Sequence, residues 1–152
     1  GLDGLREAVN SVSDQLGRRL KFVVGKPGLD GHSNGAEQIA FRARDCGMDI
    51  TYDGIRMTPE ELVAQALEDD AHVVGLSILS GSHLPLVEDL MQRMKEAGLS
   101  HIPVIVGGII PDEDAEKLRS IGVARVYTPK DFELNSIMGD IVDLAKHPKI
   151  AS

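Results

Sequence analysis

A chain of 152 residues with 42% hydrophobic and 26% charged residues has the size and composition of one ordinary folded domain. Its net charge of −8 would repel the phosphates of nucleic acid, so charge-driven binding to DNA or RNA is not expected. The sequence has no apolar run near the ~18 residues of a membrane span and no signal-peptide pattern at its start, and the lone Cys46 excludes a disulfide framework and a cysteine zinc site, so we expect a cytoplasmic protein.

The predicted elements alternate between helix and strand from the start of the chain. Apolar residues recur at helical spacing over residues 2–17, where Gly17 suits the end of a helix. A short buried strand is predicted over residues 20–25, followed by a Gly-rich loop over 26–33 and a helix over 34–46.

The rest of the chain continues this alternation. Residues 58–61 are a strong helix start, because Thr58 can cap, Pro59 fits the first helical position and Glu61 completes a capping box. The other strands are predicted over residues 48–52, 72–79, 103–106 and 124–127, and the other helices begin near Leu84, at Pro111 and at Glu133. The strand over 72–79 is apolar almost throughout, as expected where helices cover both faces of a parallel sheet.

Five strands with short helical connections predict an α/β fold with a doubly wound parallel sheet. We expect the flavodoxin-like strand order 2-1-3-4-5, with helices on both faces and an additional N-terminal helix. The only internal boundary that the sequence predicts follows Gly17, so residues 1–19 would be an N-terminal helix or the end of a linker, and residues 20–152 the main domain. The first residue is Gly rather than Met, which is compatible with a free subunit or with a domain excised from a longer protein.

Ligands of such sheets bind beyond the carboxyl ends of the strands, where the strand order reverses. Here that point lies between the first and third strands, so the segments 26–35, 77–83 and 107–108 form the candidate site. These segments contain neither the Gly pattern of a dinucleotide site nor a P-loop. The five histidines are scattered, and only His32 and His83 are expected at this edge, which argues against a zinc site.

The tripeptide Asp30-Gly31-His32 carries the remaining chemistry. An Asp two residues before a His can accept the imidazole N–H, which fixes the tautomer and raises the basicity of the nitrogen that would bind a metal. The neighbouring glycines allow this loop to approach a bulky ligand closely.

Three motifs in chain order carry a resemblance to a known family. They are Asp30-x-His32-x-x-Gly35, Ser77-x-Leu79 and Gly107-Gly108, with 41 residues between the first two and 27 between the second and third. Together they resemble the cobalamin-binding signature of corrinoid enzymes. Within that superfamily the chain resembles the C-terminal domain of the adenosylcobalamin-dependent acyl-CoA mutases, and residues 79–83 and 127–131 are more similar to the ethylmalonyl-CoA mutase branch than to methylmalonyl-CoA mutase.

The resemblance implies a role for each motif residue. His32 would replace the cofactor's own dimethylbenzimidazole as the lower ligand of cobalt, Asp30 would hydrogen-bond His32, and Lys26 would tune this pair. Further contacts with the cofactor, including its displaced nucleotide tail, would come from Gly31, Ser33, Gly35, Ser77, Leu79, Gly107, Gly108, Tyr127 and Thr128.

The resemblance also implies an activity and a partner. Adenosylcobalamin would supply the radical for the carbon-skeleton rearrangement of ethylmalonyl-CoA or methylmalonyl-CoA. In the family a separate barrel domain binds the acyl-CoA, so this domain alone would bind cobalamin and isomerise nothing. A homo-oligomer is compatible with this arrangement.

Other functions and plainer interpretations of the same residues stay open from the sequence. Methyl-carrying corrinoid proteins share the Asp-x-His-x-x-Gly pattern, and a cobalamin-dependent sensor module or an interaction module without cofactor would share the fold. Gly107 and Gly108 would also serve as packing glycines, and Ser77 as a buried hydroxyl bonded to the backbone. His72 is expected at the edge of a strand, and Cys46 in the core.

Overall fold

The structure is a computed structural model that describes residues 1–25, 34–52, 57–78 and 84–146. Its elements, in chain order, are α1 (Leu2–Leu16), β1 (Lys21–Gly25), α2 (Asn34–Asp45), β2 (Asp49–Thr51), α3 (Pro59–Asp69), β3 (Val73–Ile78), α4 (Leu84–Glu96), β4 (Val104–Gly108), α5 (Asp112–Ser120), β5 (Arg125–Tyr127), the 3₁₀ turn η2 (Pro129–Asp131) and α6 (Leu134–Lys146). None of the helices described is long and apolar enough to span a membrane.

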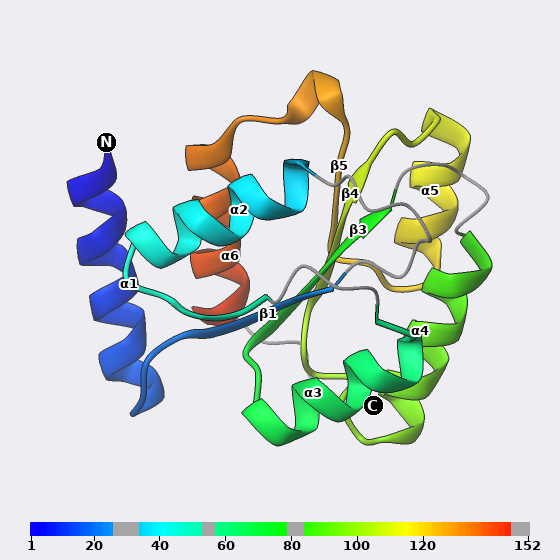
Figure 1. Cartoon of the computed structure of the whole chain (residues 1–152), viewed down its shortest axis with the longest axis horizontal. Helices are drawn as coiled ribbons and strands as arrows, with labels where there is room; N and C mark the ends of the chain where they lie inside the picture. Colours follow the sequence, from blue (N-terminus) through cyan, green and yellow to red (C-terminus); the bar gives the residue numbers. More distant parts are fainter. Residues whose placement is uncertain (26–33, 53–56, 79–83, 147–152) are drawn as a thin grey trace.

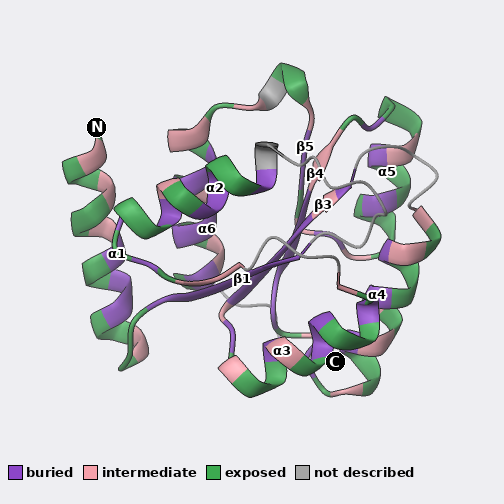
Figure 2. Cartoon of the chain, in the orientation of Figure 1, coloured by how far each residue is buried: buried purple, intermediate pink, exposed green. Residues whose placement is uncertain are grey.

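The sheet has the predicted topology. All five strands are parallel and lie in the order β2-β1-β3-β4-β5, which confirms the doubly wound, flavodoxin-like arrangement. Helices α1, α2 and α6 cover one face of the sheet, and α3, α4 and α5 cover the other (Figure 1). Four of these strands, β1, β3, β4 and β5, are buried along most of their length, whereas the edge strand β2 is exposed or half-buried (Figure 2).

Successive residues of a strand point to opposite faces, so the central strands contribute to two different cores. Toward α3, α4 and α5 they present the large buried side chains of Val74, Leu76, Ile78, Val104 and Val106. Toward α1, α2 and α6 the alternate positions are Gly75, Ser77, Ile105 and Gly107. Because three of these four residues are small, the second face has less side-chain volume near the carboxyl ends of the strands.

Local signals set the ends of the helices as the sequence predicts. Gly17 follows α1 with a φ of 78°, a left-handed conformation that glycine adopts without strain. At the start of α3, Thr58 Oγ1 accepts from the backbone N–H of Glu61 at 3.1 Å, and Glu61 Oε1 accepts from the backbone N–H of Thr58 at 2.9 Å. The capping box is therefore complete.

Several strand ends differ from the predicted ones, most by a single residue. β1 begins at Lys21 because the backbone N–H of Leu20 donates to Ser13 Oγ at 3.0 Å rather than to a neighbouring strand. β4 does not end at Val106 but continues to Gly108, since both glycines remain paired in register with β3. The Gly-Gly motif is therefore part of the sheet.

The amino edge of the sheet carries a network of polar and charged side chains. Lys21 Nζ lies 3.2 Å from Asp49 Oδ1 and 3.8 Å from Asp69 Oδ2. Thr51 Oγ1 donates to the same Asp69 oxygen at 2.6 Å. The backbone N–H of Lys21 donates to His72 Nδ1 at 2.9 Å, and His72 directly precedes β3, as expected for a residue at a strand edge. The network therefore links β1, β2 and α3 to the start of β3.

Candidate ligand pocket at the carboxyl edge of the sheet

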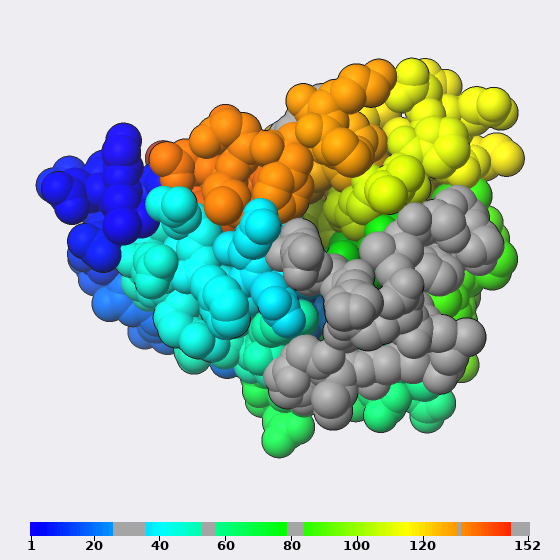
Figure 3. All heavy atoms as spheres, turned by 45° about the horizontal axis from the view of Figure 1, so that its top comes forward, coloured from blue at the N-terminus to red at the C-terminus, as the bar shows by residue number. Residues whose placement is uncertain are grey.

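A pocket of about 430 Å³ lies at the carboxyl ends of the strands, a volume in the range of small-molecule sites. We call it the carboxyl-edge pocket; its lining consists of Phe22, Val24, Ala36, Gln38, Ile39, Gly75, Leu76, Ser77, Ile78, Ile105, Gly107, Gly108, Ile109, Tyr127, Thr128, Pro129 and Phe132. In Figure 3, α2 (cyan), the segment after β5 (orange) and the end of β4 (yellow-green) converge on this side. The pocket therefore lies on the face of the sheet that carries the small residues.

The small residues of β3 and β4 shape the pocket in different ways. The ring of Phe22 fills the space beside Gly75, because a Cβ added there would lie 2.8 Å from Phe22 Cζ. A Cβ added to Gly107 would lie 3.8 Å from Tyr127 Cβ and from the Tyr127 carbonyl oxygen, with no other described atom within 4 Å. No described residue therefore fills the space above Gly107.

Gly108 is required by the neighbouring strand. Its φ is 156°, and a Cβ added to it would lie 1.7 Å from the carbonyl oxygen of Ile78 on β3. No side chain fits at that distance from the backbone of β3. The packing of the two strands therefore explains why position 108 is a glycine, without reference to any ligand. The two glycines of one motif thus have different roles in the fold.

Tyr127 of β5 lines the pocket, and its hydroxyl is bonded to a neighbouring helix. The residue is 7% exposed, and Tyr127 Oη donates to Asp140 Oδ2 of α6 at 2.6 Å. Burial, followed by the hydrogen bond with Asp140 and its charge, raises the pKa of Tyr127 far above its ordinary value. The hydroxyl therefore stays protonated and remains a donor to Asp140.

The described lining is mostly hydrocarbon. Besides Tyr127, its polar side chains are those of Gln38, Ser77 and Thr128. An apolar pocket with aromatic walls and a few polar groups suits a flat aromatic or heteroaromatic part of a ligand.

The structure brings together five of the residues that the sequence predicts for the site. They are Ser77, Gly107, Gly108, Tyr127 and Thr128, all in the lining of the carboxyl-edge pocket. Gly35 lies in the first turn of α2, directly before the lining residue Ala36. The remaining predicted residues, Lys26, Asp30, Gly31, His32, Ser33 and Leu79, lie outside the described residues.

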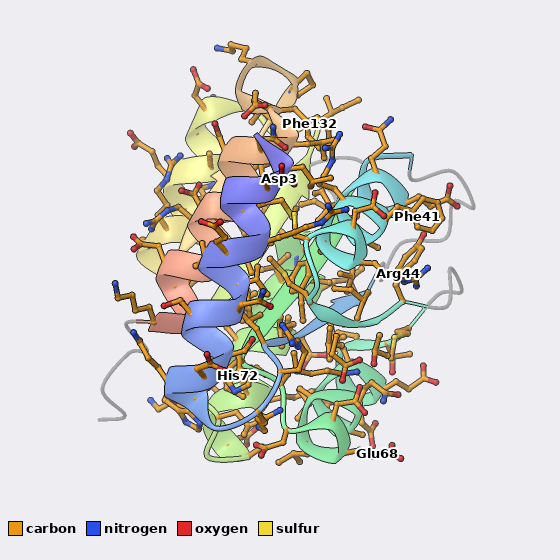
Figure 4. The ribbon with its side chains drawn as sticks, turned by 90° about the vertical axis from the view of Figure 1, so that its left-hand side faces the viewer. Asp3, Phe41, Arg44, Glu68, His72 and Phe132 are labelled. Atoms are coloured by element: carbon orange, nitrogen blue, oxygen red, sulfur yellow. The ribbon has the colours of Figure 1, made fainter. Side chains whose placement is uncertain are left out.

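Several lining residues were not predicted for the site. Phe22 and Ile105 belong to the apolar strand pattern, which has the same appearance whether a residue packs in a core or lines a cavity. Phe132 follows the η2 turn and lies at the opposite end of the molecule from His72 (Figure 4). Ile109 directly follows β4 and is 66% exposed, which is unusual for a large apolar residue. In the sequence, the signal that could have identified it is a large apolar residue directly after the Gly-Gly pair.

The described residues do not form a metal centre of their own. Within this part of the chain, no three His, Cys, Asp or Glu side chains come together in a way that could hold a metal ion. His32, the metal ligand that the sequence predicts, is outside it.

Comparison with known proteins relates the chain to a family. The profile of the B12 binding domain matches residues 20–131. The chain is 70% identical over all 152 residues to ethylmalonyl-CoA mutase of Cereibacter sphaeroides and covers 23% of that protein. It is 40% identical over 121 residues, 78% of its length, to the small subunit of 2-hydroxyisobutanoyl-CoA mutase of Aquincola tertiaricarbonis, and covers 89% of that subunit.

A solved structure has the same fold. The cobalamin-binding protein of Desulfitobacterium hafniense superposes with a TM-score of 0.63 at 20% identity, over 83% of this chain and 64% of that one. Similarity at this level of identity concerns the fold alone.

The chain spans about a quarter of the length of the ethylmalonyl-CoA mutase that it matches.

Proposed function

The chain belongs to the B12-binding domain family, and on that premise we propose that it binds cobalamin with His32 as the lower ligand of cobalt and the cofactor's nucleotide tail in the carboxyl-edge pocket. The observation that carries this proposal is the space above Gly107, which no described residue fills and which Tyr127 Cβ and the Tyr127 carbonyl oxygen border. A sheet with ordinary side chains on both faces would leave no such space.

The described residues fit a nucleotide tail. Its base is a flat heteroaromatic ring, and the rings of Phe22, Tyr127 and Phe132 in the lining can contact such a ring by its face or edge. Removing the base from water in this apolar pocket would favour the state in which the base has left cobalt. That state leaves the lower position of cobalt open to a side chain of the protein.

For the loop residues the proposal rests on the sequence. His32 would bind cobalt, Asp30 would hold the imidazole in one tautomer, and Lys26 would tune the charge of that pair. Gly31, Ser33, Gly35 and Leu79 would contact the cofactor together with the lining residues Ser77, Gly108 and Thr128.

When bound, adenosylcobalamin would supply the carbon radical for rearrangement of an acyl-CoA. The chain would contribute binding and orientation, and recognition of the acyl-CoA would belong to a barrel domain or subunit outside these 152 residues. The 70% identity with ethylmalonyl-CoA mutase favours ethylmalonyl-CoA over methylmalonyl-CoA as the substrate. The small-subunit relative shows that a chain similar to this one can be a separate subunit.

We also propose the organisation and setting that the sequence predicts. Residues 20–152 would form the cobalamin-binding domain, and residues 1–19 an N-terminal helix or the end of a linker. The assembly would be cytoplasmic, and the domain would not be catalytic alone.

The test is electron paramagnetic resonance of cob(II)alamin bound to the 152-residue chain, labelled with nitrogen-15 at histidine. Nitrogen-15 has spin one half, so an axial histidine splits each cobalt line into a doublet, whereas the cofactor's own nitrogen-14 base gives a triplet. We expect a doublet that is lost in His32→Ala and retained in His101→Ala, which replaces an exposed histidine.

A triplet would show that the cofactor's base is still on cobalt, which would contradict the lower-ligand role of His32. A doublet retained in His32→Ala would assign the role to another histidine. Absence of any bound corrinoid would contradict the proposal as a whole.

A further inference from the structure

Asp140 lies outside the carboxyl-edge pocket but is bonded to one of its walls. Asp140 is a half-buried residue of α6, and its Oδ2 atom accepts the Tyr127 hydroxyl at 2.6 Å. Asp140 is absent from the lining, whereas Tyr127 belongs to it. The contact therefore connects a helix behind the pocket to the pocket itself.

This bond determines where the hydroxyl of Tyr127 points. A hydrogen bond to a carboxylate is stronger than one between neutral groups, and a buried hydroxyl without a partner is unfavourable. With Asp140 present, the hydroxyl is satisfied on the side away from the pocket. Without Asp140, the hydroxyl would need another partner, and the polar side chains of the lining offer one on the pocket side.

The position of the Tyr127 ring decides how much of the pocket is open. Tyr127 pairs in register with Gly107, and the space above Gly107 is bounded by Tyr127 atoms 3.8 Å away from an added Cβ. A ring that turned toward the pocket would enter this space. The space that the proposed function assigns to the nucleotide tail therefore depends on where the ring is held.

We propose that Asp140 is a positioning residue for the nucleotide tail of cobalamin, because it holds the Tyr127 ring in the wall and keeps the space above Gly107 open. The inference rests on the proposed function. It assigns Asp140 no contact with the cofactor or with cobalt.

The test compares two corrinoids that share cobalt and the corrin ring and differ in the tail. Cobalamin carries the nucleotide, and cobinamide lacks it. The 152-residue chain and its variants are titrated with each corrinoid, Kd is measured from the corrinoid absorbance, and urea unfolding checks that each variant is folded.

We expect Asp140→Ala to raise the Kd of cobalamin about tenfold, as expected for loss of a bond that satisfies a buried hydroxyl, and to leave the Kd of cobinamide unchanged. Asp140→Asn retains an oxygen that can accept from Tyr127 and should recover most of the affinity. Asp143→Ala removes the same charge from an exposed position of the same helix and should change neither Kd.

A second variant separates positioning from general damage. In a Tyr127→Phe background no hydroxyl needs a partner, so adding Asp140→Ala should cause no further loss of cobalamin affinity. An additional tenfold loss would overturn the inference. So would an unchanged cobalamin Kd in Asp140→Ala, or equal losses for both corrinoids, and in these cases the proposed function would stand. If the unmodified chain bound neither corrinoid, the proposed function would fail and this inference with it.

Discussion

At the amino edge of the sheet charged side chains meet one another, whereas at the carboxyl edge β3 and β4 carry small residues beside a pocket. Lys21 begins β1 next to the carboxylates of Asp49 and Asp69. Ser77 and Gly107 lie in register near the ends of β3 and β4, and the space above Gly107 is open. The amino edge is thus filled by charged side chains, whereas the carboxyl edge combines small residues with space that no described residue fills.

The difference between the two edges indicates which one is functional. Groups with shifted pKa values often mark functional sites. At the amino edge the shifted groups, Asp69 and His72, are bonded to neighbours within the fold. At the carboxyl edge Tyr127, whose pKa is raised, is likewise bonded within the fold, to Asp140, and the candidate site is marked by volume that no described residue fills. We therefore expect substitutions at the amino edge to change stability alone, and substitutions in the pocket lining to change ligand binding.

The largest expected effect comes from Gly108→Ala, which would break the carboxyl edge itself. The new Cβ would meet the Ile78 carbonyl oxygen at 1.7 Å, so strand β3 or β4 must move. We expect the free energy of unfolding, measured with urea, to fall by about 3 kcal/mol or more. The control is Gly139→Ala on an open face of α6, which should raise stability by about 0.5–1 kcal/mol. Equal stability of the two variants would contradict the close approach of β3.

Lys21→Met should have the next largest effect on stability, and it tests the amino edge. Burial alone would raise the pKa of Asp69, but hydrogen bonds from Thr51 and Gln65 and the charge of Lys21 hold it below its ordinary value. Without Lys21, a mostly buried carboxylate loses its cation, and we expect a loss of about 2–3 kcal/mol in unfolding free energy. The Kd for cobalamin should not change. Lys95→Met, on the surface of α4, is the matched control, and a weaker cobalamin affinity in Lys21→Met would show that the edges are coupled.

Gly107→Ala tests the pocket without disturbing the fold. Its Cβ would make only ordinary contacts with Tyr127, so the unfolding free energy should not fall. Because the methyl group would occupy the space assigned to the nucleotide tail, we expect the Kd for cobalamin to rise about tenfold, as for overpacking of a filled site. Unchanged affinity, measured by absorbance titration, would place the tail elsewhere.

The smallest effect concerns pH and the histidine of the amino edge. Burial, followed by the charge of Arg18, lowers the pKa of His72, against a smaller opposite effect of Asp70. The unfolded chain then binds a proton that the folded chain resists, so stability should fall as pH decreases through the ordinary histidine pKa of about 6.5. Urea unfolding at pH 7.5 and 5.5 should show a smaller loss in His72→Gln than in the unmodified chain. The exposed His101→Gln should keep the full loss, and equal losses in both variants would contradict the assignment.

The topology could be predicted from the sequence because its signals are local. The capping box at Thr58 spans four residues, and both of its hydrogen bonds form. The helix end at Gly17 needs only a residue that tolerates a left-handed conformation. Strand ends depend on the neighbouring strand, and β4 continues through Gly107 and Gly108 because β3 supplies partners for both. That information is not local, so the predicted strand ended too early.

The site could be predicted in part, for a similar reason. Ser77, Gly107 and Thr128 meet because the carboxyl ends of neighbouring parallel strands share one edge of the sheet. The bond between Tyr127 and Asp140 could not be predicted, because it joins different elements and depends on how α6 packs against β5. The distinction between the two glycines of one motif also needs coordinates, since it depends on the distance to the backbone of Ile78.

The position of Tyr127 in the chain also determines when the pocket can exist during synthesis. Phe22 is added about 100 residues earlier, which at roughly 5–20 residues per second corresponds to about 5–20 s of translation. Until β5 and α6 have left the ribosome, the strands that form the floor have no wall on that side, and Asp140 cannot hold the ring. A nascent chain therefore has no complete carboxyl-edge pocket, and under the proposed function loading with the nucleotide tail would follow the completion of α6.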